Sequence, residues 1–131
     1  MRMTNSMKAL LDSTVIIHLL RKRQQAVEWI NNNSGMLGIT STTWMEVIEG
    51  TASKQHQSYC KQTLSQFSLV FPVISDHQWA MEQLEIYQFS HHIGMNDCLI
   101  AAVAFRLNIP LYTHNLKDMS PLIGSLAQKP Y

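Results

Sequence analysis

Hydrophobic positions along the chain form short runs that alternate between strand length and helix length. Four runs are short, apolar and bounded by polar or turn residues, a pattern typical of buried strands. The segments between them are longer, and their apolar residues either recur at helical spacing or surround a helix that must be buried. Strands are predicted at residues 8–11, 36–40, 69–73 and 109–113, and helices at 14–20, 24–30, 41–49, 54–67, 75–90 and 99–107.

This alternation predicts an α/β layer fold with a mostly parallel sheet. Within it, we expect the helix at 54–67 to bury Tyr59, Leu64 and Phe67. The last segment, 122–131, is expected to hold a short helical turn and an edge strand, and a helix is expected to begin at Pro121.

Composition limits the classes of protein that the chain can represent. Its 131 residues suit a single domain over 1–131, with 1–6 expected to be a loose tail. A charged fraction of 15% and a formal net charge of +1 exclude a disordered charged tail and broad electrostatic wrapping of nucleic acid. The two cysteines form neither a disulfide framework nor a zinc motif. With no signal peptide or apolar span, we expect a cytoplasmic protein without a membrane segment.

Acidic residues stand at the edges of the predicted apolar elements. Asp12 directly follows the first strand, Glu46 lies in the helix after the second, and Asp97 stands at the start of the buried helix. Parallel α/β sheets bind ligands outside the carboxyl ends of their strands. Clustered carboxylates repel one another unless a cation lies between them, and oxygen ligands suit Mg²⁺ or Mn²⁺. A divalent cation can activate water, so the pattern indicates phosphodiester hydrolysis.

Each acid also has a structural interpretation. Glu46 follows Thr43 by three residues, the spacing of a helix capping box, and Asp97 suits the positive end of a helix dipole. For these two, taken alone, the structural interpretation is favoured. Asp12 favours a functional interpretation, because a carboxylate that follows a buried strand is costly when unpaired.

Four segments in this order resemble the motifs of the PIN domain family. The first is Leu-Leu-Asp-Ser-Thr within 10–17, and the second is Thr-Thr-Trp-Met-Glu within 41–50. The third is Met-Asn-Asp-Cys-Leu-Ile-Ala-Ala within 94–102, and the fourth is Tyr-Thr-His-Asn within 111–118. In size the chain is similar to the VapC toxins of bacterial toxin–antitoxin pairs. The resemblance implies a three-layer α/β/α domain with a central sheet of four to five strands.

The resemblance also implies a Mg²⁺- or Mn²⁺-dependent endoribonuclease. Asp12 and Asp97 would hold the metal directly, and Glu46 would hold it directly or through water. Asn115 stands where many members carry a fourth acid, so it could orient water but adds no charge. Asp118, three residues later, would partly compensate.

Other residues are assigned supporting roles by the resemblance or by their chemistry. Ser13 and Thr113 would fix the rotamers of the carboxylates, and Thr14 replaces an amide often found in the family. The run Arg21, Lys22 and Arg23 is interpreted either as a helix C-terminus or as a contact to RNA phosphates. His18 and His114 are interpreted as packed or exposed side chains rather than metal ligands.

Three functions remain open from sequence. The first is a toxin ribonuclease with an RNA substrate, an antitoxin partner and a homodimeric state. The second is a non-catalytic PIN-like module that binds RNA or protein, which the amide at Asn115 motivates. The third, a phosphotransfer domain on a doubly wound sheet, is disfavoured because the residues expected of a haloacid-dehalogenase-type phosphatase or a receiver domain cannot be placed.

Overall fold

A five-stranded sheet, parallel throughout, forms the centre of the computed structural model, which describes residues 7–131. The spatial strand order is β3-β2-β1-β4-β5, so the first strand is central. Pairing runs outward from β1 in both directions, with Leu10 beside Gly38 of β2 and beside Leu111 of β4. The strands are β1 (Ala9–Leu11), β2 (Leu37–Thr40), β3 (Ser68–Val70), β4 (Leu111–Tyr112) and β5 (Ala127–Gln128).

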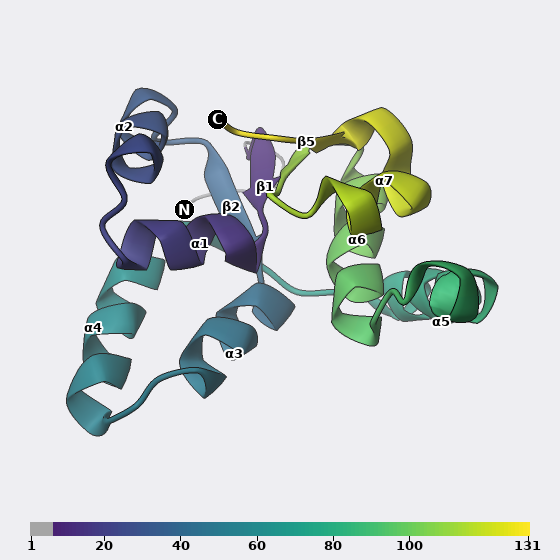
Figure 1. Ribbon diagram of the computed structural model, residues 1–131, viewed down its shortest axis with the longest axis horizontal. Helices are drawn as coiled ribbons and strands as arrows, with labels where there is room; N and C mark the ends of the chain where they lie inside the picture. Colours follow the sequence, from purple (N-terminus) through teal and green to yellow (C-terminus); the bar gives the residue numbers. More distant parts are fainter. Residues whose placement is uncertain (1–6) are drawn as a thin grey trace.

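Helices connect the strands and cover both faces of the sheet (Figure 1). The first group lies between β1 and β3, and the second lies between β3 and β5. The first group is α1 (Ser13–Leu20), α2 (Gln24–Asn32), α3 (Ser41–Glu49) and α4 (Lys54–Leu64). The second is α5 (Ile74–His91), α6 (Met95–Leu107) and α7 (Leu116–Ile123), followed by the short 3-10 turn η2 (Gly124–Leu126).

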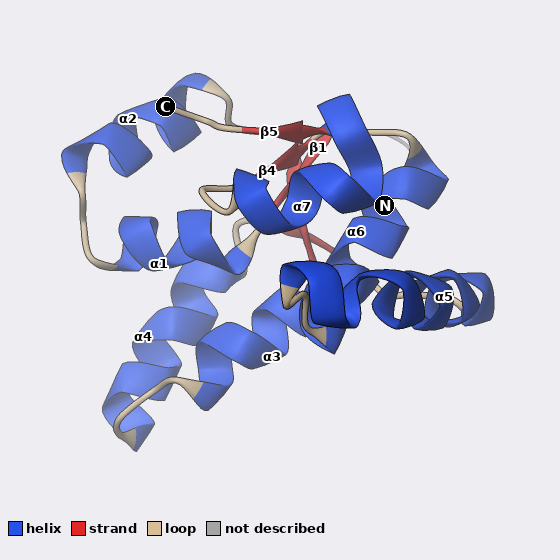
Figure 2. Cartoon of the chain, turned by 45° about the vertical axis from the view of Figure 1, so that its right-hand side comes forward, coloured by secondary structure: helices blue, strands red, loops and turns tan. Residues whose placement is uncertain are grey.

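Two hydrophobic cores lie on opposite faces of the sheet. Ala9 and Leu11 face the core formed with α1 to α4, whereas Leu10 faces the core formed with α5 to α7. This alternation follows from the two-residue period of a strand, and all three side chains are buried. The predicted three-layer α/β/α fold with a mostly parallel sheet is therefore confirmed, and Figure 2 shows the strands between the helices.

Three local predictions need comment, and two of them were wrong. Leu64 and Phe67 are buried as predicted, but Tyr59 is 42% exposed, because α4 turns its Cys60 and Leu64 side into the core. The last α-helix begins at Leu116 rather than at Pro121, which lies inside it. The helical turn and the edge strand predicted within 122–131 are confirmed by η2 and β5. Residues 1–6, expected to be a tail, lie outside the described residues. Within residues 7–131, the helices are too short or too polar to cross a bilayer.

Candidate active site

The site begins where β1 and β4 end side by side. Asp12 follows β1, and its backbone N–H donates to the carbonyl of Tyr112 at 2.9 Å. Its carboxylate is 3% exposed and accepts hydrogen bonds at Oδ2 from Thr113 Oγ1 (2.8 Å) and Thr14 Oγ1 (3.1 Å). After β1 the chain continues to β2 on one side of β1, and after β3 it continues to β4 on the other side. The carboxyl ends of β1 and β4 therefore form the topological switch point, where parallel sheets bind ligands. Asp12 is thus a buried carboxylate held in one orientation.

Thr113 links Asp12 to the fourth motif. Besides donating to Asp12, its hydroxyl accepts a hydrogen bond from the backbone N–H of Asn115 at 2.9 Å. The Asn115 side-chain amide donates to Asp118 Oδ2, also at 2.9 Å. Asp118 lies in the first turn of α7 and contributes a negative charge that raises the pKa of Asp97. The fourth motif therefore brings one carboxylate toward the site, oriented by the amide of Asn115.

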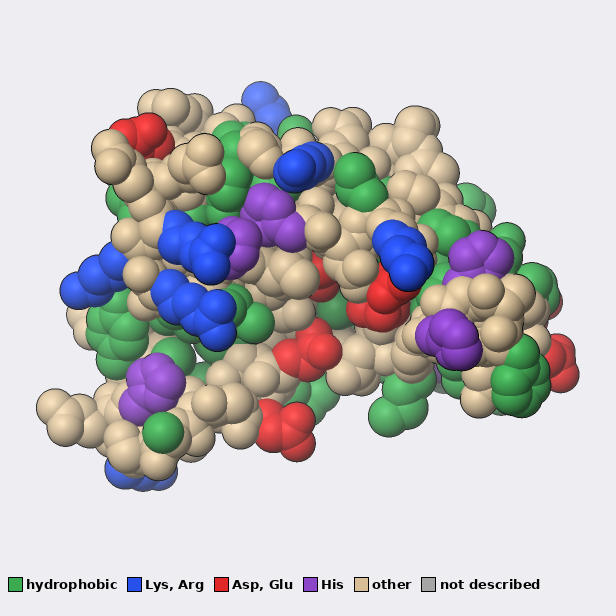
Figure 3. Space-filling model, in the orientation of Figure 1, with side chains coloured by type: hydrophobic (Ala, Val, Ile, Leu, Met, Phe, Trp, Pro, Cys, Tyr) green, Lys and Arg blue, Asp and Glu red, His purple; other side chains and the backbone are tan. Residues whose placement is uncertain are grey.

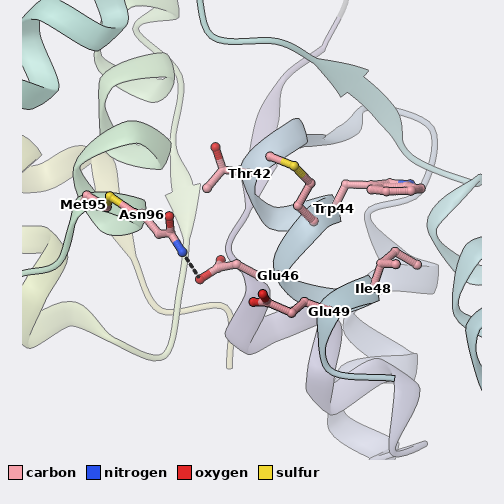
Figure 4. Close-up of a pocket in the computed structure, with 8 residues that line it drawn as sticks. Thr42, Trp44, Glu46, Ile48, Glu49, Met95 and Asn96 are labelled. Carbon is pink, nitrogen blue, oxygen red and sulfur yellow. Dashed lines mark hydrogen bonds between the residues drawn. The ribbon is translucent and has the colours of Figure 1, made fainter. Parts of the chain in front are cut away.

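Glu46 reaches the site from the second turn of α3. The helix begins directly after β2, and Thr40 is its N-cap, accepting from the N–H of Thr43 at 3.2 Å. The proposed capping box of Thr43 and Glu46 is therefore wrong, and Glu46 is free to point across to α6. There its Oε2 accepts from Asn96 Nδ2 at 3.2 Å, as Figure 4 shows.

The second carboxylate oxygen of Glu46, Oε1, is buried and accepts no hydrogen bond from any of residues 7–131. Burial and the negative charge of Asp12 raise the pKa of Glu46, against the lowering effect of Asn96 and Ser13. Glu46 also lines a cleft of about 420 Å³ between α3 and the start of α6, together with Glu49 and Met95 (Figure 4).

Asp97 completes the acidic cluster from the first turn of α6. Burial raises its pKa to about 6, with further contributions from the charges of Asp12, Asp118 and Glu46, while the Gly94 backbone lowers it. Its position also suits the helix dipole, so the structural interpretation and a functional one apply together. A carboxylate that three other carboxylates make less acidic indicates a site with an excess of negative charge.

The donor set fits a hard divalent cation. All four acids offer oxygen ligands, and a cation would neutralise the repulsion at Asp97 and provide a partner for Glu46 Oε1. Among residues 7–131, no group of three Asp, Glu, His or Cys side chains lies close enough to enclose a metal ion. The charges of Asp12, Glu46 and Asp97 act on one another across a common acidic space, although the three side chains do not converge on one point.

The basic run follows the end of α1, as the structural interpretation predicted. Arg21, Lys22 and Arg23 are exposed and form the connection to α2, where Lys22 has a positive φ of 58° and the Arg21 N–H donates to Ile17. On the face in Figure 3, Lys and Arg side chains gather beside His side chains over this part of the molecule. Acidic side chains lie to the right of them, near the middle of the same face.

The protein is a parallel three-layer α/β/α domain with an acidic site at its switch point. Sequence comparison gives the family. A PIN domain model matches residues 9–118, so the chain belongs to the PIN domain family. No curated protein sequence matches the chain significantly.

Solved structures share the fold at low sequence identity. A toxin–antitoxin complex from Klebsiella pneumoniae has a chain that is 23% identical, with a TM-score of 0.78 and coverage of 94% of this chain and 98% of that one. DNA-bound VapBC from Salmonella typhimurium gives 20% identity, a TM-score of 0.81 and coverage of 95% and 99%. A chain of FitAB bound to a DNA fragment is 19% identical, with a TM-score of 0.73 and coverage of 93% of this chain and 94% of that one.

Sequence reasoning misses two polar interactions of the site. The sequence marks Asn96 only as the neighbour of Asp97, yet its amide is the hydrogen-bond donor to Glu46. It marks Thr14 as a departure from the family, yet the Thr14 hydroxyl donates to Asp12 and accepts from the His114 N–H at 3.1 Å. The signal for both is adjacency to a candidate acid, which is too common in sequences to select them.

Proposed function

We propose that this protein is a Mg²⁺- or Mn²⁺-dependent endoribonuclease and the toxin of a toxin–antitoxin pair. The observation that carries the proposal is the acidic space into which Asp12, Glu46 and Asp97 bring their charges, with the pKa of Asp97 raised to about 6. Oxygen-only donors and an unpartnered carboxylate oxygen favour a hard cation over a purely structural role.

The acidic residues would hold the cation, and the polar residues beside them orient the carboxylates. Asp12 and Asp97 would hold the cation, and Glu46 would hold it directly or through water. When bound, a divalent cation activates water and neutralises charge on the phosphodiester. Thr113 and Thr14 keep the Asp12 carboxylate in one rotamer, and Asn115 orients Asp118. Ser13 lies close enough to Glu46 to lower its pKa.

The test uses Glu46→Gln, which removes one charge and keeps the shape of the side chain. Protein stripped with EDTA is incubated with total RNA and Mn²⁺, and cleavage is followed on denaturing gels while Mn²⁺ uptake is measured by calorimetry. We expect discrete cleavage by the wild type and a loss of about tenfold to a hundredfold in the variant, since one ligand contributes a few kcal/mol. The control Glu28→Gln removes an exposed charge from α2 and should match the wild type. RNA cleavage that survives in EDTA, or equally in both variants, contradicts the proposal.

A second candidate function is a PIN-like module that binds RNA or protein without cleaving RNA. It is favoured by Asn115, an amide where many members carry a carboxylate, and by the absence of a converged three-ligand set within residues 7–131. Retention of RNA together with no Mn²⁺ uptake by calorimetry would support this function and exclude the nuclease.

The antitoxin would be a separate protein. The related chains from Klebsiella pneumoniae and Salmonella typhimurium were crystallised in a toxin–antitoxin complex and as DNA-bound VapBC. We propose that a partner segment with an Arg side chain binds this chain at the acidic cleft, because a guanidinium can pair with Glu46 and its neighbours. Such a segment would block the site by occupying the space of the cation.

A homodimer would form through α5. Ile74, Met81 and Phe89 recur at seven and eight residues, which puts them on one side of the helix, and they are 79%, 70% and 85% exposed. Large apolar side chains exposed in a row mark interaction sites, and a second copy of the same helix is complementary to such a row.

We expect light scattering at micromolar concentration to give a dimer for the wild type and a monomer for Met81→Glu with Phe89→Glu. Facing carboxylates in the interface would repel and lose the apolar burial. Lys54→Glu on α4 introduces a negative charge elsewhere and should remain dimeric. A monomeric wild type excludes this interface.

A further inference from the structure

An aromatic cluster that the carboxylate chemistry does not use lies beside the acidic site. The rings of His18 and His114 lie 4.4 Å apart, inclined at 34°. Tyr131 meets His114 edge-on with ring centroids 4.6 Å apart, and its hydroxyl is hydrogen-bonded to His18 Nδ1 at 2.8 Å. All three side chains are partly exposed. The cluster brings α1, the end of β4 and the last described residue together.

One hydroxyl connects this cluster to Asp12. The backbone N–H of His114 donates to Thr14 Oγ1, which in turn donates to the Asp12 carboxylate. His114 also lies between Thr113 and Asn115 in the chain, the two residues of the fourth motif that shape the site. The negative charge of Asp12 is close enough to act on the pKa of the His114 ring. A ligand on the cluster would therefore extend directly to the carboxylates.

Cations surround the same rings. Burial lowers the pKa of His18, and the charges of Arg23 and Arg21 lower it further. Burial likewise lowers the pKa of His114, together with His18, Lys129 and Arg23. The lowered pKa values favour the neutral form of both rings, and Arg21, Arg23 and Lys129 lie near enough for their charges to act on them. Figure 3 shows this association of Lys and Arg side chains with His side chains on one face.

The His114 ring is also incompletely satisfied. Its Nε2 is buried and has no hydrogen-bond partner among the described residues. A buried polar nitrogen without a partner is costly in a purely structural cluster, and it offers a contact to a ligand that displaces or rearranges Tyr131.

We propose that His18, His114 and Tyr131 form a nucleotide subsite, in which a base of single-stranded RNA stacks on the aromatic cluster and the adjoining phosphates contact Arg21 and Arg23. The proposal rests on the proposed function, in which RNA is the ligand, and adds which residues bind one of its nucleotides. Stacking on aromatic rings with flanking cations is how proteins hold single strands. A nucleotide bound here would place the neighbouring phosphodiester near Asp12.

The test measures RNA binding in EDTA, so that neither metal nor cleavage contributes. Fluorescence anisotropy follows a labelled random-sequence RNA of about twelve nucleotides, long enough to cover a single-strand site, and an abasic strand of the same length. We expect His114→Ala and Tyr131→Ala to bind the RNA about fivefold to a hundredfold more weakly and to bind the abasic strand almost as the wild type does. His114→Phe, which keeps a ring, should recover most of the affinity.

Matched variants separate stacking from charge and from folding. His77→Ala removes an exposed imidazole from α5 and should bind as the wild type does. Arg23→Gln should weaken binding of both strands and reduce the slope of log Kd against log salt by about 0.7 for each phosphate that the variant no longer neutralises. Circular dichroism checks that each variant is folded, and Tyr131→Ala gives a variant whose folding does not depend on His114.

Unchanged RNA binding by folded His114→Ala and Tyr131→Ala would overturn the subsite, as would an equal loss on the abasic strand or no binding by the wild type. Failure of the subsite is distinguishable from failure of the nuclease. Cleavage that depends on Glu46 without any effect of the cluster leaves the nuclease alone standing. Binding that depends on the cluster without cleavage leaves the subsite alone standing.

Discussion

Asp97→Asn is expected to abolish metal-dependent RNA cleavage while making the protein more stable. The variant removes a charge from the space that Asp97 shares with Asp12, Asp118 and Glu46. Because transition-state stabilisation by a bound cation is worth several kcal/mol, and each ~1.4 kcal/mol is a factor of ten, cleavage should fall by at least about a hundredfold. Mn²⁺ uptake in calorimetry should weaken in parallel.

The gain in stability follows from the direction of the pKa shift. Between its ordinary pKa of 3.8 and about 6, the folded carboxyl keeps a proton that the unfolded chain releases. Folded protein therefore binds more protons in this window, and its free energy of unfolding falls as pH rises through it. Above pH 6 the penalty is fully present, at about 1–2 kcal/mol once solvent screening of this partly exposed group is allowed for. Asn cannot ionise, so the variant avoids the penalty.

Urea unfolding of metal-free wild type and Asp97→Asn at pH 4 and pH 8 measures this difference. We expect similar stability at pH 4 and a more stable variant at pH 8. Glu28→Gln, the exposed-charge control, should follow the wild type at both values. A variant less stable than the wild type at pH 8 would show that Asp97 is held by favourable contacts, and equal cleavage rates would remove it from the site.

The fold was predictable because the spacing of hydrophobic residues marks its strands and helices. Ala9, Leu10 and Leu11 form a continuous apolar run because helices cover both faces of the sheet, and the segments between the strands are longer and have apolar residues at helical spacing. The position of Asp12 beside the end of β4 was predictable for the same reason, since parallel strands bring their carboxyl ends to one edge, whereas Glu46 and Asp97 lie on helices α3 and α6. Asp12 beside Thr113, 101 residues apart, follows from that geometry alone.

The bounds of α3, 41–49, were predicted, but the residue that caps the helix was not. Residues 40–43 read Thr-Ser-Thr-Thr, and each of them is a good N-cap. Thr40 takes the role because it is the last residue of β2, paired with Val70 of β3, and the helix follows without a loop. That choice depends on strand register, which the local sequence does not encode. Its consequence reaches the site: with Thr40 as the cap, Glu46 is not the third residue of a capping box, and its side chain is not tied to the helix start.

A buried ion pair between α5 and α6 was also absent from the sequence pattern. Asp76, 2% exposed, accepts from Arg106 Nε at 2.9 Å and from the Val73 N–H at 2.8 Å. The two charged residues lie thirty positions apart on helices that appear in the sequence only as apolar periodicity. The pair joins the first turn of α5 to the last turn of α6.

Arg106→Met should lower the free energy of unfolding by about 2–4 kcal/mol, because it leaves the buried Asp76 carboxylate without its cation. The value lies below that of a fully buried pair, since the Arg106 side chain is 33% exposed. For a domain of this size, the melting temperature should fall by roughly 8–15 °C. Adding Asp76→Asn to Arg106→Met should recover part of the stability by removing the unpaired charge. Lys61→Met, at an exposed site on α4, should change the free energy of unfolding little. Equal losses of stability in Arg106→Met and Lys61→Met would refute the role of the pair.

The activity of Arg106→Met separates folding from chemistry. Arg106 lies nine residues along α6 from Asp97, about 14 Å at ~1.5 Å per residue, so it touches none of the carboxylates of the acidic site. At 25 °C, well below its melting temperature, the variant should cleave RNA at the wild-type rate per folded molecule. Its activity should then disappear at the temperature at which circular dichroism records unfolding. A loss of cleavage at 25 °C with the fold intact would mean that the packing of α5 on α6 sets the position of Asn96 and Asp97 in the site.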